Sequence, residues 1–384
     1  MTAAGWEWML IAAATVIAVL TVIIAWQATR ISALGAQVTE LRHRIEVGEA
    51  VAAHPKKPHQ RLVGVVVNVT KESADEAVRL IHTACAQAGM PDPLIMASSA
   101  QDPGHVMTRR ALESGCDVVI AAGGDGTIRA VATELAGTET ALGVVPLGTG
   151  NLFARNIGLP RHDLAACVSE AIHGTGHRVD TLVLTLERAG GRTEREVSLV
   201  IAGGGLDAEV MADTREVLKQ RAGWLAYGEA GLRHVMGPRQ TVTVQLDDGD
   251  PATFRVRSVL LANCGMLQAG MELVPSAAFD DGHMDAVLLT PRHALDWARI
   301  VAKTALRFSS EIPVMRVRQA RAGKLTMAEP MPFQIDGDAV GEVISVRAKV
   351  APGSLIVHGV SPEVLQSPAA LSDHAARPPR TEQP

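Results

Sequence analysis

Residues 117–127, which read Asp-Val-Val-Ile-Ala-Ala-Gly-Gly-Asp-Gly-Thr, are of types that together could bind a phosphate group. A short apolar run ends at Gly123 and Gly124, presents one carboxylate at Asp125, and leads into a helical pattern that we expect to begin at Thr127. Glycines let successive backbone N–H groups approach phosphate oxygens, and a helix N-terminus adds more N–H groups. Asp125 would repel a phosphate, so its useful role is to hold Mg²⁺ beside one. The alternative is a plain strand-to-helix turn in which Asp125 is a local cap.

A second glycine-rich loop follows about 20 residues later. Residues 141–146 are again apolar, and Leu-Gly-Thr-Gly-Asn at 147–151 precedes a helical stretch at 152–156. Two strand–loop–helix units so close in the chain predict neighbouring parallel strands, whose carboxyl ends lie at one edge of a sheet. Both loops would then face one cleft, which a pair of ordinary turns does not explain.

The two motifs, Gly-Gly-Asp-Gly-Thr and Pro-Leu-Gly-Thr-Gly-Asn-Leu-Phe-Ala-Arg-Asn-Ile-Gly-Leu-Pro, resemble the diacylglycerol kinase catalytic domain family. Bacterial lipid kinases share that domain with sphingosine and ceramide kinases. The resemblance continues in order at Gly-Gly-Gly-Leu-Asp-Ala (203–208), at the run 263–285, and at Ile-Asp-Gly-Asp (335–338). Each motif alone is weak, but the ordered set, which covers roughly residues 62–360, favours this family.

The resemblance implies ATP as phosphoryl donor and Mg²⁺ as its metal. Residues 68–72 read Asn-Val-Thr-Lys-Glu, where the family usually has Asn-Pro-x-Ser/Thr-Gly, so this loop departs from the pattern. Ser99 stands where the family commonly places a threonine near the nucleotide, and an ordinary surface serine is the alternative. The nucleotide-binding residues implied in this way are Asn68, Thr70, Ser99, Gly123, Gly124, Asp125, Gly126, Thr127, Gly148, Thr149, Gly150 and Asn151.

Phosphoryl transfer to an alcohol also needs a metal ligand and a group that takes the hydroxyl proton. The resemblance implies Asp125 as catalytic metal ligand, with Asp180, which matches a family aspartate at the domain junction, as its partner. Asp336 and Asp338 stand two residues apart around Gly337, and in an extended segment they would share one face. The family usually has glutamate at the second position, so Asp338 reaches less far. The sequence leaves open which of the two is the base, and a hairpin turn is the alternative.

A second Mg²⁺ site is implied at residues 278–283. In bacterial relatives a structural Mg²⁺ is held by backbone carbonyls and by the second aspartate of Asp-Asp-Gly. Here those ligands would be the Ala278 carbonyl, the Asp281 carboxylate and the His283 carbonyl, a set that suits a hard cation. The alternative is an Asp-Gly turn.

Residues 6–29 have the properties of a transmembrane helix. No charged residue occurs from Trp8 to Thr29, and a helix of that length spans about 33 Å, enough to cross a bilayer. Trp6, Trp8 and Trp26 lie near the two ends, where indole rings favour the membrane interfaces. A cleaved signal peptide or a buried core helix are the alternatives. No Lys or Arg precedes the apolar run and no small-residue cleavage site ends it, which favours a retained anchor.

The flanks of this span predict its orientation. Arg30, Arg42 and Arg44 follow it, so the positive-inside rule places the rest of the chain in the cytoplasm, at the cell membrane. Residues 31–45 carry aliphatic side chains at alternating spacings of three and four, a seam that could form a homodimer as a coiled coil. A juxtamembrane helix that continues the span is the alternative. The basic linker 54–58 ends this region (30–60) and could contact anionic headgroups.

Composition bounds the remaining possibilities. The chain has 384 residues, which indicates more than one domain, and a net charge of −5, which argues against a nucleic-acid binder. Aromatic residues make up 3%, so the cores must be aliphatic. The 4 cysteines are scattered without a Cys-x-x-Cys pair, which indicates a reducing compartment and no structural zinc.

Periodicity divides the soluble part into two domains. Residues 61–181 alternate apolar runs with helical patterns, which predicts an α/β domain with a parallel sheet and helices on both faces. Residues 182–353 contain short alternating runs separated by turns, which predicts a β-rich, sandwich-like domain with helical inserts near 208–220, 225–235 and 294–308. The resemblance implies that this domain binds the lipid. The resemblance implies that a last strand near 354–360 returns to the first domain. The tail 366–384 has a composition typical of disorder.

Three functional classes fit these observations. The first is a membrane-anchored, ATP-dependent lipid kinase that phosphorylates diacylglycerol to phosphatidate or, alternatively, a sphingoid base or ceramide. The second is a soluble-substrate kinase of the NAD kinase type, since those kinases also carry Gly-Gly-Asp-Gly. The second loop motif and the apolar N-terminus favour the lipid kinase. The third, a catalytically weak membrane-attached binding protein, is disfavoured by the retained Asp125, Asp180 and Asp336. The sequence does not identify the lipid.

Overall fold

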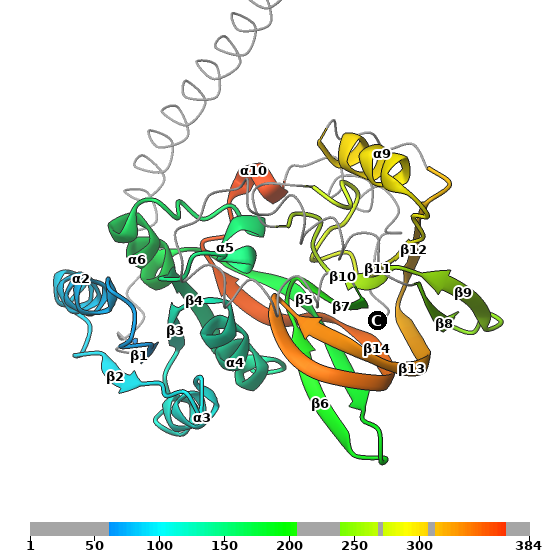
Figure 1. Ribbon diagram of the computed structural model, residues 1–384. Helices are drawn as coiled ribbons and strands as arrows, with labels where there is room; N and C mark the ends of the chain where they lie inside the picture. Colours follow the sequence, from blue (N-terminus) through cyan, green and yellow to red (C-terminus); the bar gives the residue numbers. More distant parts are fainter. Residues whose placement is uncertain (1–60, 206–238, 268–271, 306–311, 366–384) are drawn as a thin grey trace, which may run out of the picture. The chain divides into compact units, whose positions relative to one another are not determined.

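The computed structural model describes residues 61–205, 239–267, 272–305 and 312–365 (Figure 1). The predicted transmembrane helix (6–29), the juxtamembrane region (30–60), the inserts expected at 208–220 and 225–235, and the C-terminal tail (366–384) lie outside these residues. None of the helices within the described ranges is both long and apolar enough to cross a membrane.

A parallel sheet forms the first part of the chain, as the sequence predicts. Its strands are β1 (Val63–Val67), β2 (Leu94–Ala97), β3 (Val118–Gly123) and β4 (Ala141–Pro146), in the order β4-β3-β1-β2. Every residue of β1, β3 and β4 is buried, because helices cover both faces of this sheet. A strand buried on both faces needs apolar side chains throughout, which explains the uninterrupted apolar runs.

Alternate residues of these strands pack against different helices. Val63, Val65 and Val67 of β1 share a core with α2 (Ala74–Gln87) and α6 (Leu164–His173) on one face. On the other face Val66 shares a core with α3 (His105–Glu113), α4 (Asp125–Leu135) and the short α5 (Leu152–Asn156). The period of two along each strand therefore supplies two separate apolar layers.

The second part of the chain is β-rich and sandwich-like. Its elements are β5 (Gly176–Glu187), β6 (Thr193–Ser198), β7 (Ile201–Gly205), β8 (Gln240–Leu246), β9 (Ala252–Val256), β10 (Ser258–Ala262), β11 (Met284–Leu289), α9 (Ala294–Ala305), β12 (Met315–Ala320), β13 (Ala322–Ile335), β14 (Asp338–His358) and α10 (Pro362–Leu365). The antiparallel strands enclose a largely aliphatic core, to which β5 and the strands from β7 to β14 contribute buried side chains.

One long strand joins the two parts. β14 begins at a hairpin with β13, where Ile335 pairs with Asp338, and then pairs along its length with β5. Near its end Val357 pairs with Leu142 in parallel, so β14 lies beside β4 in a single hydrogen-bonded sheet (Figure 1). At the hairpin tip Asp336 and Gly337 adopt φ values of 50° and 89°. The tip carries the two aspartates that the sequence singles out.

Candidate active site

The two glycine-rich loops lie against each other at the carboxyl ends of β3 and β4. Leu147 N–H donates to the Gly123 carbonyl at 2.8 Å, which continues the ladder between the strands past their ends. A Cβ placed on Gly148 would lie 2.9 Å from the Gly124 Cα and 2.9 Å from Asn151 Oδ1, so no side chain fits at position 148. With no side chain at 124 or 148, a single ligand can approach the backbone of both loops closely, as phosphate binding requires.

The second loop is closed by its own asparagine. Asn151 has φ 46°, its Nδ2 donates to the Gly148 carbonyl at 2.7 Å, and its Oδ1 accepts from Gly148 N–H at 3.1 Å. Asparagine tolerates this left-handed conformation better than most residues. The bonds hold Thr149 and Gly150 at the turn, with Thr149 exposed.

Thr127, which the resemblance places among the nucleotide-binding residues, lies in the protein interior and not at the surface. Its side chain is buried, and a Cβ on Gly123 would lie 2.6 Å from the Thr127 Oγ1. Thr127 therefore explains why position 123 must be glycine. The residue packs the first turn of α4 under the loop.

Asp125 joins the two loops. It is the first residue of α4, and its Oδ1 accepts a 2.6 Å hydrogen bond from Leu152 N–H at the start of α5. Burial raises the pKa of Asp125 to about 6, and the carboxylates of Asp336 and Asp338 add to this rise, against the opposing effect of the Leu152 bond. A half-buried carboxylate near two others attracts a cation, and a carboxylate oxygen is a ligand that suits Mg²⁺.

Asp338 lies directly over the first loop. A Cβ on Gly126 would lie 2.8 Å from the Asp338 Oδ2, so glycine at 126 makes room for this carboxylate. Arg129, one turn further along α4, places Nη2 3.3 Å from the same oxygen and Nη1 3.4 Å from the Ile335 carbonyl. The Asp338 side chain is 26% exposed and is therefore open to a substrate.

Asp336 has a different environment. Its side chain is buried, and its two oxygens accept four hydrogen bonds, from Ser198 Oγ at 2.7 Å and from the N–H groups of Leu199, Val200 and Ile201 at 2.9 Å each. These four bonds hold the Asp336 carboxylate against the turn at 198–201. Asp336 therefore fixes the tip of the hairpin, whereas Asp338 lies beside the first glycine-rich loop.

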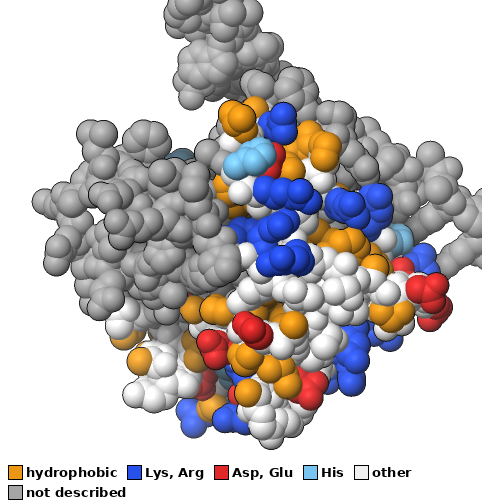
Figure 2. All heavy atoms as spheres, turned by 45° about the vertical axis from the view of Figure 1, so that its right-hand side comes forward, with side chains coloured by type: hydrophobic (Ala, Val, Ile, Leu, Met, Phe, Trp, Pro, Cys, Tyr) orange, Lys and Arg blue, Asp and Glu red, His pale blue; other side chains and the backbone are white. Residues whose placement is uncertain are grey.

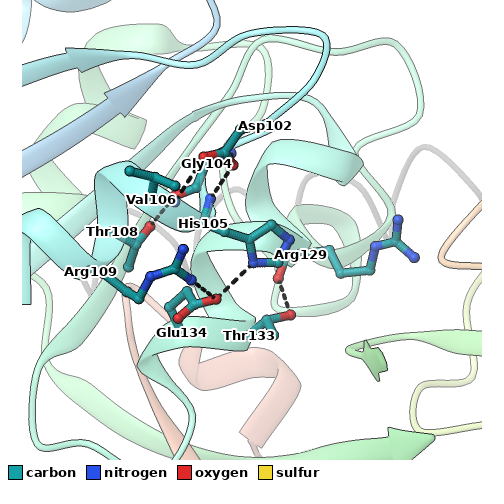
Figure 3. Close-up of polar contacts among 9 residues, drawn as sticks. All are labelled: Asp102, Gly104, His105, Val106, Thr108, Arg109, Arg129, Thr133 and Glu134. Carbon is teal, nitrogen blue, oxygen red and sulfur yellow. Dashed lines mark hydrogen bonds and ion pairs between the residues drawn. The ribbon is translucent and has the colours of Figure 1, made fainter. Parts of the chain in front are cut away.

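A contact between α3 and α4 holds the helix that carries Asp125 and Arg129. Glu134 of α4 binds His105 Nδ1 at 2.9 Å and the Arg109 guanidinium at 2.8 Å (Figure 3). Asp102 caps α3 by accepting from the N–H groups of Gly104, His105 and Val106. Ser99 Oγ accepts from Asp102 N–H at 3.1 Å, so this serine forms part of the cap.

The loop after β1 brings in a residue that sequence reasoning missed. Asn68 Oδ1 accepts from the N–H and the Oγ1 of Thr70 at 3.1 and 2.7 Å, so these two predicted contacts bind each other. Lys71 follows, and its Cε lies 4.0 Å from the position of a Cβ on Gly124. Only the departure from the family pattern at 68–72 could have drawn attention to this lysine.

Asp180 lies in a different group of residues from Asp125. Its Oδ2 accepts from Gly282 N–H and its Oδ1 from Gly353 N–H, both at 2.6 Å, and its own N–H donates to the Phe279 carbonyl. Burial raises the pKa of Asp180. Its contacts link it to the predicted structural loop 278–283 instead of to the glycine-rich loops.

In the loop 278–283, Asp281 Oδ1 accepts from His283 N–H at 2.8 Å, and the His283 Nδ1 lies 2.8 Å from the Asp281 carbonyl. The nearby Asp285 has a buried Oδ1 without a hydrogen-bond partner, and its pKa is raised to about 6 by burial and by Asp281. A buried carboxylate oxygen without a hydrogen-bond partner fits a cation at this place. The described ranges hold no cluster of three or more His, Cys, Asp or Glu that could bind a metal through side chains alone.

The chain joins a parallel sheet that carries two glycine-rich loops to a β-sandwich-like part, and both parts match known kinase domains. The diacylglycerol kinase catalytic domain matches residues 63–184, and the YegS C-terminal NAD kinase beta sandwich-like domain matches residues 200–359. The chain belongs to the diacylglycerol kinase family and is a lipid kinase.

Similar proteins support this placement. The diacylglycerol kinase of Bacillus subtilis (strain 168) is 30% identical over 259 residues, which cover 66% of this chain and 82% of that protein. A Pseudomonas aeruginosa (PAO1) protein named "Probable lipid kinase YegS-like" is 30% identical over 297 residues, 75% of this chain and 91% of its own. The crystal structure of a diacylglycerol kinase from Bacillus anthracis has the same fold, with a TM-score of 0.58, 18% identity, and coverage of 80% of this chain and 100% of its own.

Proposed function

We propose that this lipid kinase transfers the γ-phosphoryl group of ATP to the hydroxyl of diacylglycerol, giving phosphatidate, with Asp338 as the base. The observation that carries the proposal is the position of Asp338, whose Oδ2 lies at the surface of Gly126 within the first phosphate loop. A base must reach the substrate hydroxyl while the phosphates occupy the loops. Of the two candidate aspartates, Asp338 satisfies this condition and Asp336 does not.

The remaining residues have roles that follow from their contacts. The glycine-rich loops at 123–127 and 148–151 bind and orient the phosphates. Asp125 would hold Mg²⁺, which neutralises charge on the phosphates when bound. Arg129 holds the Asp338 carboxylate and the Ile335 carbonyl, so it positions the base. Asp336 anchors the tip of the hairpin on the turn at 198–201.

Diacylglycerol as substrate is supported by the relatives that carry this name. A sphingoid base or ceramide is the alternative, because the alcohol chemistry is the same. Turnover by the purified protein, measured with radiolabelled ATP and mixed micelles of each lipid alcohol, tests the choice. We expect label in phosphatidate; label in a sphingoid phosphate alone would refute the substrate, and no transfer to any lipid would refute the activity.

The proposal includes attachment to the membrane, with the catalytic part in the cytoplasm. Its basis is the apolar stretch 6–29 and the arginines that follow it. Figure 2 shows Lys and Arg side chains gathered beside hydrophobic ones on one face of the β-rich part. α9 and β12, which lie on that side of the molecule, carry exposed Arg299, Arg316 and Arg318, and Leu295 is 70% exposed. Such a face suits an anionic bilayer.

A chain that begins at His59 tests the attachment. We expect it to be soluble and to phosphorylate lipid in micelles, yet to act poorly on intact vesicles, since the anchor no longer brings it to the bilayer. A full-length protein whose mature N-terminus lies near residue 36 would refute a retained anchor. Crosslinking of the full-length protein and of the chain that begins at His59 tests the homodimer proposed for residues 31–45.

A further inference from the structure

The loop after β1 directs a lysine side chain onto the phosphate loops. Lys71 N–H donates to the Asn68 carbonyl at 3.1 Å, and the Asn68 side chain fixes Thr70 between them. This tight turn folds the chain back at the carboxyl end of β1, the strand next to β3. As a result the Lys71 Cε lies 4.0 Å from the point where a Cβ on Gly124 would be.

Three loops therefore converge at one place. They follow β1, β3 and β4, which are neighbours in the sheet, and they bring Lys71, Gly124 and Gly148 together. Gly124 and Gly148 carry no side chain, so a ligand can approach the backbone of both loops closely. Among the described residues, Lys71 is the only one with a positively charged side chain within 4 Å of the Cβ position of Gly124.

The charge on Lys71 is not neutralised within the described part of the protein. Among residues 61–205, 239–267, 272–305 and 312–365, Lys71 forms no ion pair and no side-chain hydrogen bond. Its side chain is half-buried, so the ammonium is held near the loops while water still reaches it. An ammonium without an ionic partner, held beside two glycine-rich loops, is an arrangement that attracts a polyanion.

We propose that Lys71 binds the polyphosphate of the nucleotide and sets the preference of this enzyme for nucleotides with two or three phosphates. The inference rests on the proposed function, since it assigns the two loops to a nucleotide. It goes beyond that function because Lys71 stands where the family pattern Asn-Pro-x-Ser/Thr-Gly has a serine or threonine. The contact between Lys71 and the polyphosphate is therefore specific to the loop of this chain.

The proposal predicts an effect that grows with the number of phosphates. Replacing Lys71 by Met keeps the length of the side chain and removes its charge. A hydrogen bond between charged groups at a partly exposed site corresponds to about a tenfold change in affinity. We expect Lys71→Met to weaken ATP and ADP binding about tenfold and to leave adenosine binding unchanged, with AMP between them.

The test measures binding of ATP, ADP, AMP and adenosine to the full-length protein in detergent micelles, by calorimetry or by displacement of a fluorescent nucleotide. Lys71→Arg should retain most of the affinity, because it keeps the charge. Arg79→Met is the matched control: it removes one positive charge from the exposed surface of α2 and should bind as the wild type does. In turnover assays the KM for ATP should rise in Lys71→Met more than kcat falls.

Two results would overturn the proposal. One is wild-type affinity for ATP in Lys71→Met; the other is an equal loss for adenosine and ATP, which would indicate a structural role. Failure of the proposed function is distinguishable. If the wild-type protein binds ATP but phosphorylates no lipid, the proposed kinase activity is refuted. The comparison of ATP, ADP, AMP and adenosine binding between wild type and Lys71→Met still tests the role of Lys71.

Discussion

Exchanging each of the two hairpin aspartates for asparagine should separate a base from a structural carboxylate. Asp338 contacts Arg129 and the surface of Gly126 and is 26% exposed, so Asp338→Asn keeps the shape of the site. It removes the basic oxygen, and loss of a general base typically lowers the rate by about 10²–10⁴. We expect that loss in kcat, with a melting temperature close to that of the wild type.

The same change at Asp336 should act on stability. The Asp336 carboxylate accepts four hydrogen bonds. In Asp336→Asn an NH₂ group replaces one carboxylate oxygen and faces at least one of those donors. At least one hydrogen bond to a charged acceptor is therefore lost. That loss costs about 1.5–3 kcal/mol, with further repulsion between the opposed N–H groups. For a protein of this size it corresponds to a fall of roughly 2–5 °C in melting temperature.

The two variants are compared by calorimetry and by turnover in micelles at saturating ATP. Asp338→Glu is the matched control, because it keeps the carboxylate and restores the family's usual length; it should retain activity. The reasoning would be refuted by Asp338→Asn turning over within a few-fold of the wild type. It would also be refuted by Asp336→Asn melting like the wild type while being inactive.

Three further predictions follow from the site. Burial raises the pKa of Asp125 from its ordinary 3.8 to about 6 in the folded protein. The folded state therefore favours the protonated carboxyl, and this contribution to the free energy of unfolding is complete below pH 3.8 and is lost as the pH rises to about 6. In Mg²⁺-free buffer the melting temperature should therefore fall between pH 3.8 and about 6. In Asp125→Asn the melting temperature should depend less on pH, and turnover should fall about 10²–10³-fold. A pH dependence equal to that of the wild type would contradict the assignment of this titration to Asp125. Gly126→Ala places a Cβ 2.8 Å from the Asp338 Oδ2 and should lower kcat with little effect on the KM for ATP, as steady-state kinetics would show. Asp281→Asn should abolish thermal protection by Mg²⁺ before it affects turnover of the folded enzyme, and a Mg²⁺ titration of the melting temperature tests this.

The sequence predicted the parallel sheet well because its strands are buried on both faces. The uninterrupted apolar runs of β1, β3 and β4 are typical of such strands. β2 was not predicted, since it is a four-residue edge strand, partly exposed, whose pattern carries little signal. The helix expected from Thr127 begins two residues earlier, because Asp125 already belongs to the first turn of α4.

The different roles of the two hairpin aspartates could not be predicted. The groups that engage Asp336 belong to residues 198–201, far away in the chain, and only the folded sheet brings them together. The glycines at 203 and 204 show the same limit. In sequence they are part of a glycine-rich family motif with no visible packing role, yet they lie in β7, where a Cβ on Gly203 would lie 2.4 Å from Leu260 Cδ2. Local patterns reveal elements, whereas close packing depends on partners that are remote in sequence.

The pairing of β14 with β4 has a consequence for how the protein is made. On the ribosome, β4 emerges with Leu142, but its neighbour Val357 emerges only when nearly the whole chain has been synthesised. The nucleotide-binding sheet therefore cannot complete itself during translation, and its β4 edge must wait for the last strand. Non-local pairing of this kind slows folding. Chains released early by truncation would carry an open sheet edge, which is a template for aggregation.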